Sequence, residues 1–441
     1  MNPQVIPNPS PPSTAPAYPP LRLSWAVWGL AALLYLIGFF HRLAPAVMTQ
    51  ELMRDFDISA AALGNLSGFY FYSYWVMQIP TGVLADSRGP RRMLTWGALG
   101  AAIGSLVFGC SPALLPACLG RLLIGAGGSV AFVMSLKLAA AWFPPRYYSM
   151  ISGLGLFTGI IGGVSAGVPL RLLVDALGWR AVMVAAAALT AVLAAVTWRL
   201  VRDDPGERGY RSYAETPRAA RAAEAVSPLA GVAEVFRHRN TGLLFLAPAG
   251  MVGTTLTFCG LWGVPFLTTH YGLHTAEAAA LTSLIMIVWA GASPFFGWLS
   301  DRSGRRKPLL IAGQALAAVG WAVILFVPGL PMAALIALAL ASALCSATFI
   351  IIWPLSKESV PSRLAGTITG VLNMGNMFGA TVLQPAVGWV LDRQWDGAMR
   401  DGVRVFNLEA YHAGFALMMG WVVLGLVLFC FTRETHCRQS A

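Results

Sequence analysis

The chain has 441 residues, of which 57% are hydrophobic and only 11% charged. A water-soluble fold of that size would lack the polar surface to cover itself, so the composition predicts a protein of the lipid bilayer. The formal net charge is +11, but most basic residues lie in short loops and one central linker. Anchoring at the cytoplasmic membrane surface accounts for them, and we expect no nucleic-acid partner.

The start of the chain is rich in proline and polar residues, and it has no basic start followed by an apolar core. This pattern predicts a disordered cytoplasmic tail over residues 1–24 rather than a cleaved signal peptide. The six cysteines are scattered without C-x-x-C or C-x-x-H spacing. Neither a disulfide framework nor a metal site is indicated, and we expect no cofactor.

Twelve apolar runs follow, each long enough, at about 20 residues, to cross a bilayer. They lie near 25–48, 60–83, 92–111, 113–141, 148–174, 180–200, 241–268, 275–299, 309–328, 331–356, 363–391 and 408–431. We therefore expect an all-α membrane protein with an N-terminal six-helix bundle over 25–200 and a C-terminal one over 241–431. A polar linker, 201–240, joins them, and 432–441 is expected to be a cytoplasmic tail.

Internal repeats support a duplicated bundle. The stretches 82–92 and 297–307 are near-copies 215 positions apart, and both join long apolar segments. The matching pairs are Gly82/Gly297, Asp86/Asp301, Gly89/Gly304 and Arg91/Arg306. A second echo at 217 positions relates the fifth and eleventh runs through Pro144/Pro361, Arg146/Arg363, Gly153/Gly370, Gly162/Gly379 and Asp175/Asp392. Duplicated membrane bundles usually move solutes.

The positions of arginine and lysine predict the orientation. Basic residues gather in the loop after the second run, in the linker and in the loop after the eighth run, whereas the loops near 112, 270 and 329 have none. The basic loop residues are Arg88, Arg91, Arg92, Arg302, Arg305, Arg306 and Lys307. Both termini are therefore expected in the cytoplasm, with the protein in the bacterial inner (plasma) membrane. The loop 392–407 does not follow the rule that basic loops are cytoplasmic. Its three arginines, accompanied by three aspartates, fall on the predicted outside.

The repeated loop has a physical logic. Gly82 and Gly297 would allow close helix contact, and the glycines at 89 and 304 would permit a tight turn. The arginines would hold the loop at the anionic membrane surface. Asp86 and Asp301, at helix ends, can pair with a basic residue or a helix N-terminus of the opposite bundle in one conformation only. We therefore expect a gate here; the alternative is that these residues only anchor the topology.

The motif G-x-x-x-D-x-x-G-x-R-[RK], present twice, resembles the signature loop of the major facilitator superfamily, and the twelve-helix plan covers nearly the whole chain. The resemblance implies two bundles around a central cavity that opens alternately to each side. It also implies that Asp86 and Arg91 help to hold the outward-open state. Ser87 stands where the family usually has a basic residue, so the charge pairing of the first loop is expected to shift by one position, to Arg88.

Two further segments resemble family motifs. Arg121 with Gly125, Gly127 and Gly128 is similar to the motif of helix four, whose arginine is linked in the family to coupling or to structural pairing. The glycine-rich stretch 155–163 is similar to the antiporter motif of helix five, but it lacks the proline that normally follows the second glycine. That departure weakens an efflux reading.

Charges inside the membrane point to a solute path, because each costs on the order of 2.5–3.5 kcal/mol at a helix centre unless it faces water or a partner. None of the 19 acidic residues lies near the middle of a predicted span. The intramembrane charges are basic instead: Arg42, Arg121, Lys137 and Arg171. A cavity with uncompensated positive charge should bind an anion. Lys137 is equally well explained as snorkelling to the interface, and Arg171 is near the outer boundary.

Polar residues complete the candidate site. Tyr70 and Tyr74 lie on one helical face with Gln78, and Asn373 and Asn376 come from the eleventh run. Interhelical hydrogen bonding is the alternative explanation for the asparagines. His41 is a candidate proton acceptor for coupling, although a lone histidine is more often merely hydrogen-bonded. Arg121 is a second coupling candidate, by resemblance to the family motif alone.

Together these features predict a secondary active transporter of a small anionic or zwitterionic organic solute, such as a carboxylate, an amino-acid derivative or a phosphorylated metabolite. We expect uptake by a monomer, with the proton as the candidate coupling ion; uniport and exchange also remain open. The alternative function is efflux of drugs or of a siderophore-like product. No Walker loop, metal cluster or nucleophile–base pair is present in the sequence, so an enzyme is not expected.

Overall fold

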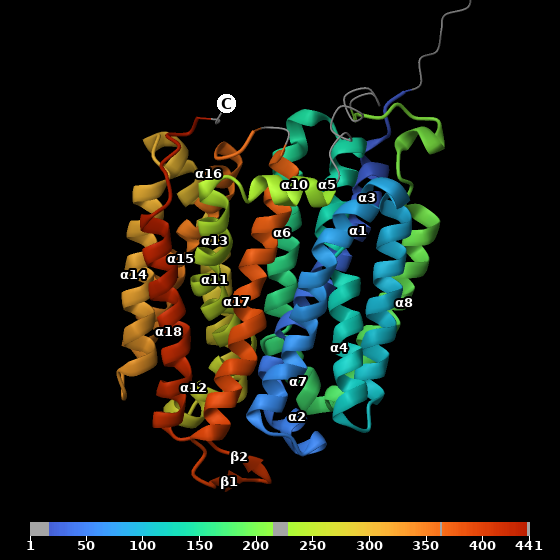
Figure 1. Cartoon of the computed structure of the whole chain (residues 1–441). Helices are drawn as coiled ribbons and strands as arrows, with labels where there is room; N and C mark the ends of the chain where they lie inside the picture. Colours follow the sequence, from blue (N-terminus) through green and yellow to red (C-terminus); the bar gives the residue numbers. More distant parts are fainter. Residues whose placement is uncertain (1–16, 215–227, 362–363, 439–441) are drawn as a thin grey trace, which may run out of the picture.

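The computed structural model describes residues 17–214, 228–361 and 364–438, apart from the side chains of residues 83, 85–87, 149, 228 and 229. Its long helices run side by side in two halves, blue to green for the first part of the chain and yellow to red for the last (Figure 1). The linker and both ends of the described chain lie at one face, which we call the linker face. The opposite face, which carries α2 and the two short strands, is called the hairpin face.

The first half contains α1 (Leu21–Leu43), η1 (Ala44–Val47), α2 (Thr49–Phe56), α3 (Ala60–Cys110), α4 (Leu114–Gly128), α5 (Ala131–Trp142), η2 (Pro145–Tyr147), α6 (Tyr148–Ser165), α7 (Val168–Leu177) and α8 (Trp179–Leu200). The linker contains η3 (Pro205–Arg208) and α10 (Pro228–Val235). The second half contains α11 (Arg239–Thr257), η4 (Phe258–Trp262), α12 (Gly263–Tyr271), α13 (Thr275–Ser303), α14 (Lys307–Phe326), α15 (Met332–Ser346), η5 (Ala347–Ile351), α16 (Ile352–Glu358), α17 (Ala365–Arg393), β1 (Met399–Arg400), β2 (Val403–Arg404) and α18 (Leu408–Cys430).

Ten of the described helical segments are long and apolar enough to cross a membrane. The other two predicted spans, 60–83 and 363–391, form the first part of α3 and most of α17. Polar residues interrupt both helices, and the two pack against each other where the halves meet. A helix that faces the other half rather than lipid does not need an unbroken apolar sequence. The predicted all-α fold of twelve helices in two six-helix bundles agrees with this arrangement.

The long helix α3 consists of two spans joined by a turn. At Gly89 the backbone has φ = 73°, a conformation that residues with a side chain rarely adopt. The carboxylate of Asp203, which follows α8, occupies the space that a Cβ on Gly89 would need, and it accepts a hydrogen bond from the Arg91 backbone N–H at 2.6 Å. Gly304, with φ = 64°, makes the matching turn after α13. The prediction of tight turns at Gly89 and Gly304 is confirmed.

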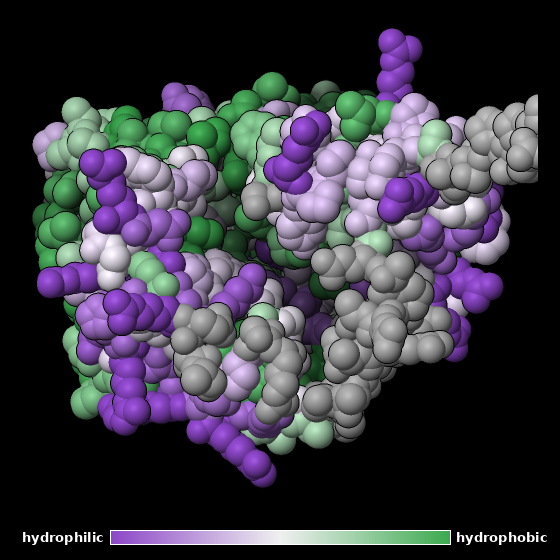
Figure 2. All heavy atoms as spheres, turned by 90° about the horizontal axis from the view of Figure 1, so that it is seen from above, coloured by the Kyte–Doolittle hydropathy of each residue, from purple (hydrophilic) through white to green (hydrophobic). Residues whose placement is uncertain are grey.

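The prediction that Gly82 and Gly297 allow close helix contact is wrong for this conformation. A Cβ at either position would meet no atom within 4 Å. Both residues lie near the linker face, where the space-filling view shows the molecule hollowed between its two halves (Figure 2). Because neighbouring helices do not approach these glycines while this face is open, small side chains are not required here by packing.

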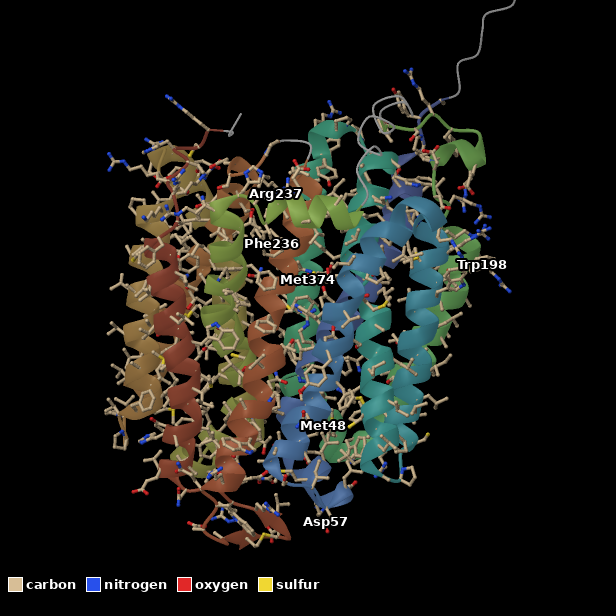
Figure 3. All side chains as sticks on the ribbon, viewed as in Figure 1. Met48, Asp57, Trp198, Phe236, Arg237 and Met374 are labelled. Carbon is tan, nitrogen blue, oxygen red and sulfur yellow. The ribbon has the colours of Figure 1, made fainter. Side chains whose placement is uncertain are left out.

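The linker crosses the linker face by means of α10, at the end of which Phe236 and Arg237 are labelled in Figure 3. Val235 is buried against Ile368 and Val371 of α17, so the linker helix packs on the second half.

The two halves meet tightly at the hairpin face, which Asp57 and Met48 mark in Figure 3. Asp392, in the last turn of α17, accepts hydrogen bonds from the backbone N–H groups of Ala60 at 3.0 Å and Ala61 at 2.7 Å. A residue of the second half thus caps the N-terminus of α3 in the first half. Such a cap typically contributes about 0.5–2 kcal/mol. The same carboxylate pairs with Arg404 at 3.1 Å, which places one of the unexpected basic residues of the 392–407 loop in a local ion pair.

Filling the contact between α3 and α17 should open the hairpin face. A Cβ on Gly64 would lie 2.6 Å from the Gln384 backbone oxygen, so Gly64→Val adds about 1–3 kcal/mol of overpacking to this conformation alone. Labelling of Ser283→Cys by a membrane-impermeant maleimide should therefore become roughly tenfold faster, because Ser283 lines a small cavity between the halves.

The labelling is measured in a background in which the exposed Cys110 and Cys430 are replaced by serine. Gly291→Val is the matched control, because a Cβ there meets nothing within 4 Å. Equal labelling rates in the two glycine variants would contradict the tight contact.

Candidate solute site

Arg42, in the last turn of α1, lies in a cage of aromatic rings. Its guanidinium carbon is 4.2 Å from the ring centre of Phe39, 4.8 Å from that of Tyr74 and 5.6 Å from that of Tyr70. Phe39 precedes Arg42 by three residues and shares its helix face, and the two tyrosines stack one turn apart on α3. The predicted Tyr70–Tyr74 stripe therefore faces the predicted arginine.

Among the described residues, no carboxylate neutralises the charge of this cage. Arg42 is 2% exposed, and its Nε has no hydrogen-bond partner among the described residues. The ion pairs found in the described part of the chain include neither Arg42 nor Arg121. Ring faces offset part of the charge, at about 0.5–2 kcal/mol per contact. A buried guanidinium without a carboxylate partner still attracts an anion strongly.

Arg121 supports the cage from α4. It is 1% exposed, and its guanidinium donates to the backbone oxygens of His41 at 2.5 Å and Ser67 at 3.4 Å. It also lies 5.2 Å from the ring centre of Tyr70, on which Arg42 stacks as well. This side chain therefore ties α1 to α3 directly beside Arg42. Its predicted part in coupling stays a prediction, whereas structural pairing is what the geometry displays.

His41 is fully buried, and within the described residues neither of its ring nitrogens has a hydrogen-bond partner. Its ring meets Phe40 edge-on, with centroids 5.3 Å apart. Because the His41 carbonyl oxygen accepts a hydrogen bond from Arg121, a proton on the His41 imidazole would place a second positive charge near Arg121.

Lys137 is half-buried on α5, five residues before that helix ends at Trp142.

The second half reaches the same polar stripe through α17. The Asn373 amide donates to the Gln78 side-chain oxygen at 2.9 Å, and Gln78 follows Tyr74 by one helical turn. Asn376 is 3% exposed, and its side-chain oxygen has no partner among the described residues. The structure thus joins Arg42, the tyrosines and Asn373 into one continuous group across the two halves, and the binding role of these residues stays a prediction.

Arg171 differs from Arg42 because it is fully paired. It binds Glu51 at 2.7 Å, Asp175 and the backbone oxygen of Val47, near the hairpin face. Its charge is therefore balanced, as expected for a residue near a helix end. It is a useful control for the unpaired arginine.

The two signature loops differ in their contacts. In the first, Arg91 donates to the Trp198 backbone oxygen at 2.9 Å and stacks on its indole at 4.2 Å, at the outer edge of α8 (Figure 3). The Asp86 side chain lies outside the described residues, so its predicted pairing is untested. Arg88 stacks on Trp96 at 5.7 Å.

In the second loop, Arg306 is buried between two carboxylates. Its guanidinium binds Asp301 at 2.5 Å and Glu358, at the end of α16, at 2.7 Å. Asp301 thus pairs within its own half in this conformation, not with the opposite half. Arg302 stacks on Trp298 at 5.6 Å, while Arg305, like Arg92 of the first loop, is exposed.

The sequence reasoning missed the segment after α18. Glu434 accepts hydrogen bonds from the backbone N–H groups of Arg306 at 3.0 Å and Lys307 at 2.7 Å, and so caps α14. Thr435 donates to Glu358 at 2.5 Å. Asp203 caps the second span of α3 in the same way. Both capping acids could have been found from the sequence, because each follows an arginine shortly after the last helix of its half. The two pairs are Arg202-Asp203 and Arg433-Glu434.

This cap predicts a stability change at acid pH. Burial alone would raise the pKa of the Glu434 carboxyl, but hydrogen bonds from four backbone N–H groups hold the pKa below its ordinary value of 4.5. A lowered carboxyl pKa stabilises the folded protein above the ordinary pKa, and this stabilisation is lost as the pH falls through the folded pKa. The thermal unfolding midpoint of Glu434→Gln should therefore be lower than that of the wild type at pH 7. The difference between the two midpoints should shrink toward pH 3. A difference independent of pH would contradict the charged cap.

Comparison with known proteins gives the family. The Major Facilitator Superfamily model matches residues 27–383 and 252–439. The uncharacterized transporter YybO of Bacillus subtilis is 23% identical over 93% of this chain and 95% of its own length. "Probable sulfoacetate transporter SauU" of Cupriavidus necator is 25% identical, covering 83% of this chain and 87% of its own. The gallate transporter of Pseudomonas putida is 26% identical over 65% and 68% of the two chains.

Among solved structures, a bacterial homolog of the human lysosomal transporter Spinster, inward-facing and unoccupied, superposes with a TM-score of 0.74. The two chains are 17% identical, and the match covers 93% of this chain and 97% of that one. This likeness supports the fold alone. The family model spans most of the sequence and the relatives are transporters, so the chain is a membrane carrier rather than an enzyme, and it belongs to the Major Facilitator Superfamily.

Proposed function

We propose that the chain is a secondary active carrier that takes up a small anionic or zwitterionic organic solute across the bacterial inner membrane. The observation that carries this proposal is the buried Arg42 guanidinium, which stacks on three rings and has no carboxylate partner in the described part of the chain. A carboxylate or phosphate group of the solute would supply the missing charge in a bidentate pair.

The groups around Arg42 suit the rest of such a solute. Tyr70 and Tyr74 contribute aromatic rings, and the Tyr70 hydroxyl already donates to the Gly38 backbone oxygen at 3.0 Å. Asn376 has an amide oxygen without a partner among the described residues, which can accept from a hydroxyl or ammonium group. Asn373 completes the site from the second half. The relatives named for gallate and sulfoacetate support small organic anions as the class of solute.

The orientation follows from the basic residues of the linker face, which the positive-inside rule places in the cytoplasm. The hollow in Figure 2 then opens to the cytoplasm, and the tight contact through Gly64 closes the outer side. In this reading the structure is the inward-open state, from which a solute carried into the cell is released.

Uptake into proteoliposomes tests the function. Purified carrier should give saturable uptake of at least one of labelled gallate, sulfoacetate and tartrate at pH 7, and an excess of the same unlabelled anion should abolish it. Protein-free liposomes are the control. The lipophilic cation tetraphenylphosphonium should neither enter through the carrier nor compete, because it would sit beside Arg42. Transport of this cation without transport of any of the anions would contradict the proposal and favour efflux of cationic drugs.

A further inference from the structure

We propose that the carrier exchanges one organic anion for another, rather than carrying the anion together with a proton. This inference rests on the proposed anion-carrier function and concerns how the empty site returns across the membrane. Exchange means that the carrier changes its facing side readily only while an anion is bound.

The empty site has positive charge that the protein does not neutralise. The guanidinium carbons of Arg42 and Arg121 lie 5.6 and 5.2 Å from the ring centre of the same tyrosine, Tyr70. The other titratable groups around them include His41, Tyr35, Tyr74 and Cys118, none of which is an anion near neutral pH.

No acidic residue with a described side chain lies beside Arg42 and Arg121 in the membrane-spanning part of the bundle. Those that the structure describes lie in loops, in the short helices α2, η3 and α10, beside the Gly89 turn inside α3, or in the terminal turns of the membrane helices. Within the described part of the chain, no carboxylate is therefore available to pair with Arg42 when the solute has left, and none to take up a proton there.

This charge acts on the step in which the cavity closes. Alternating access passes through an occluded state in which cavity water is excluded. Arg42 is already only 2% exposed here, so occlusion removes the little water contact that it retains and leaves the charge without a counter-ion. A bound anion supplies the counter-charge, so the loaded carrier passes through occlusion more easily than the empty one. Protonation of His41 would raise the occlusion barrier of the empty carrier further, because it adds a positive charge beside Arg121. The anion is thus the only counter-charge in both directions.

Counterflow separates exchange from proton symport. Proteoliposomes are filled either with unlabelled gallate, sulfoacetate or tartrate, or with buffer, and uptake of the same labelled anion is followed. Filled vesicles should take it up at least about tenfold faster, which corresponds to roughly 1.4 kcal/mol in the barrier of the empty return. With the membrane voltage clamped, an inside-alkaline pH gradient should change uptake into buffer-filled vesicles by less than about twofold.

The possible outcomes have distinct meanings. Accumulation in buffer-filled vesicles driven by the pH gradient would overturn exchange and leave the anion-carrier function intact. Absence of labelled uptake under both regimes would contradict the anion-carrier function itself, and exchange with it.

Gly128 offers a direct test of the charge argument. A Cβ at this position would make ordinary contacts, 3.6 Å from the Tyr70 hydroxyl and 3.6 Å from the Cα of Gly38, so a short side chain fits beside the Arg42 cage. Gly128→Asp provides the missing counter-charge. It should raise uptake into buffer-filled vesicles about fivefold or more relative to the matched Gly128→Asn, at lower anion affinity.

Gly128→Asn has the same shape without the charge and should keep the preference for filled vesicles. Retained exchange in this variant confirms that position 128 tolerates a side chain. If the aspartate and asparagine variants show the same ratio of filled to unfilled uptake, the proposed role of charge is wrong.

Discussion

Arg42→Met is expected to abolish anion uptake without lowering the stability of the carrier. Removing the charged partner of a buried ion pair costs about 2–5 kcal/mol of binding, so uptake at low substrate concentration should fall by about 30-fold or more. The same change removes an almost fully buried charge that has no carboxylate partner among the described residues. Replacing such a charge with an apolar side chain of similar volume is often neutral or stabilising.

The opposite result is expected at Arg171, which makes it the matched control. Arg171→Met leaves Glu51 and Asp175 without their partner, so the thermal midpoint should fall while uptake per folded carrier is kept. Thermal unfolding in detergent and uptake in proteoliposomes are measured on the same preparations. If Arg42→Met unfolds early and Arg171→Met loses uptake, the two arginines have been assigned in the wrong order.

The second large effect concerns Glu358 at the linker face. Glu358→Gln should destabilise the carrier by about 1.5–3 kcal/mol, because Arg306 then loses its better-buried anionic partner. The side chains of Arg306 and Glu358 are 5% and 13% exposed, so water compensates little of the loss.

Asp301→Asn provides the comparison on the same arginine. The Asp301 side chain is 69% exposed, and an exposed ion pair contributes about 0–1 kcal/mol. The thermal unfolding midpoint of Glu358→Gln should therefore be well below that of Asp301→Asn. An equal or reversed ranking would show that the signature-loop acid, and not the end of α16, holds Arg306 in place.

The sequence predicted most of the architecture because membrane helices and duplications leave local signals. The echo between the signature loops identified both turns, and positive φ at Gly89 and Gly304 confirms them. Gly82 and Gly297 were misjudged because a glycine in a pattern does not reveal whether a neighbouring helix approaches it in a given conformation. The spacing of Tyr70 and Tyr74 predicted one shared face correctly.

Contacts between distant helices were harder to foresee. Arg306 and Glu358 are 52 positions apart, and nothing in either segment names the other as its partner. Arg42 was selected because the span contains no acid, but its cage of Phe39, Tyr70 and Tyr74 depends on how α1 and α3 are packed. The roles of Lys137 and Asn376 stay predictions, since no measured solute contact tests them.

Because Asp392 caps α3, the thermal unfolding midpoint should depend on whether the carrier is open to the inside or to the outside. A carboxylate of the second half accepts hydrogen bonds from the backbone N–H groups of Ala60 and Ala61, at the start of a helix of the first half. When the outer side opens, those amide groups must turn to water, so that conformer lacks the cap. Substitutions that favour outward opening by weakening the closed hairpin face should thus lower the melting point even where they touch no core residue.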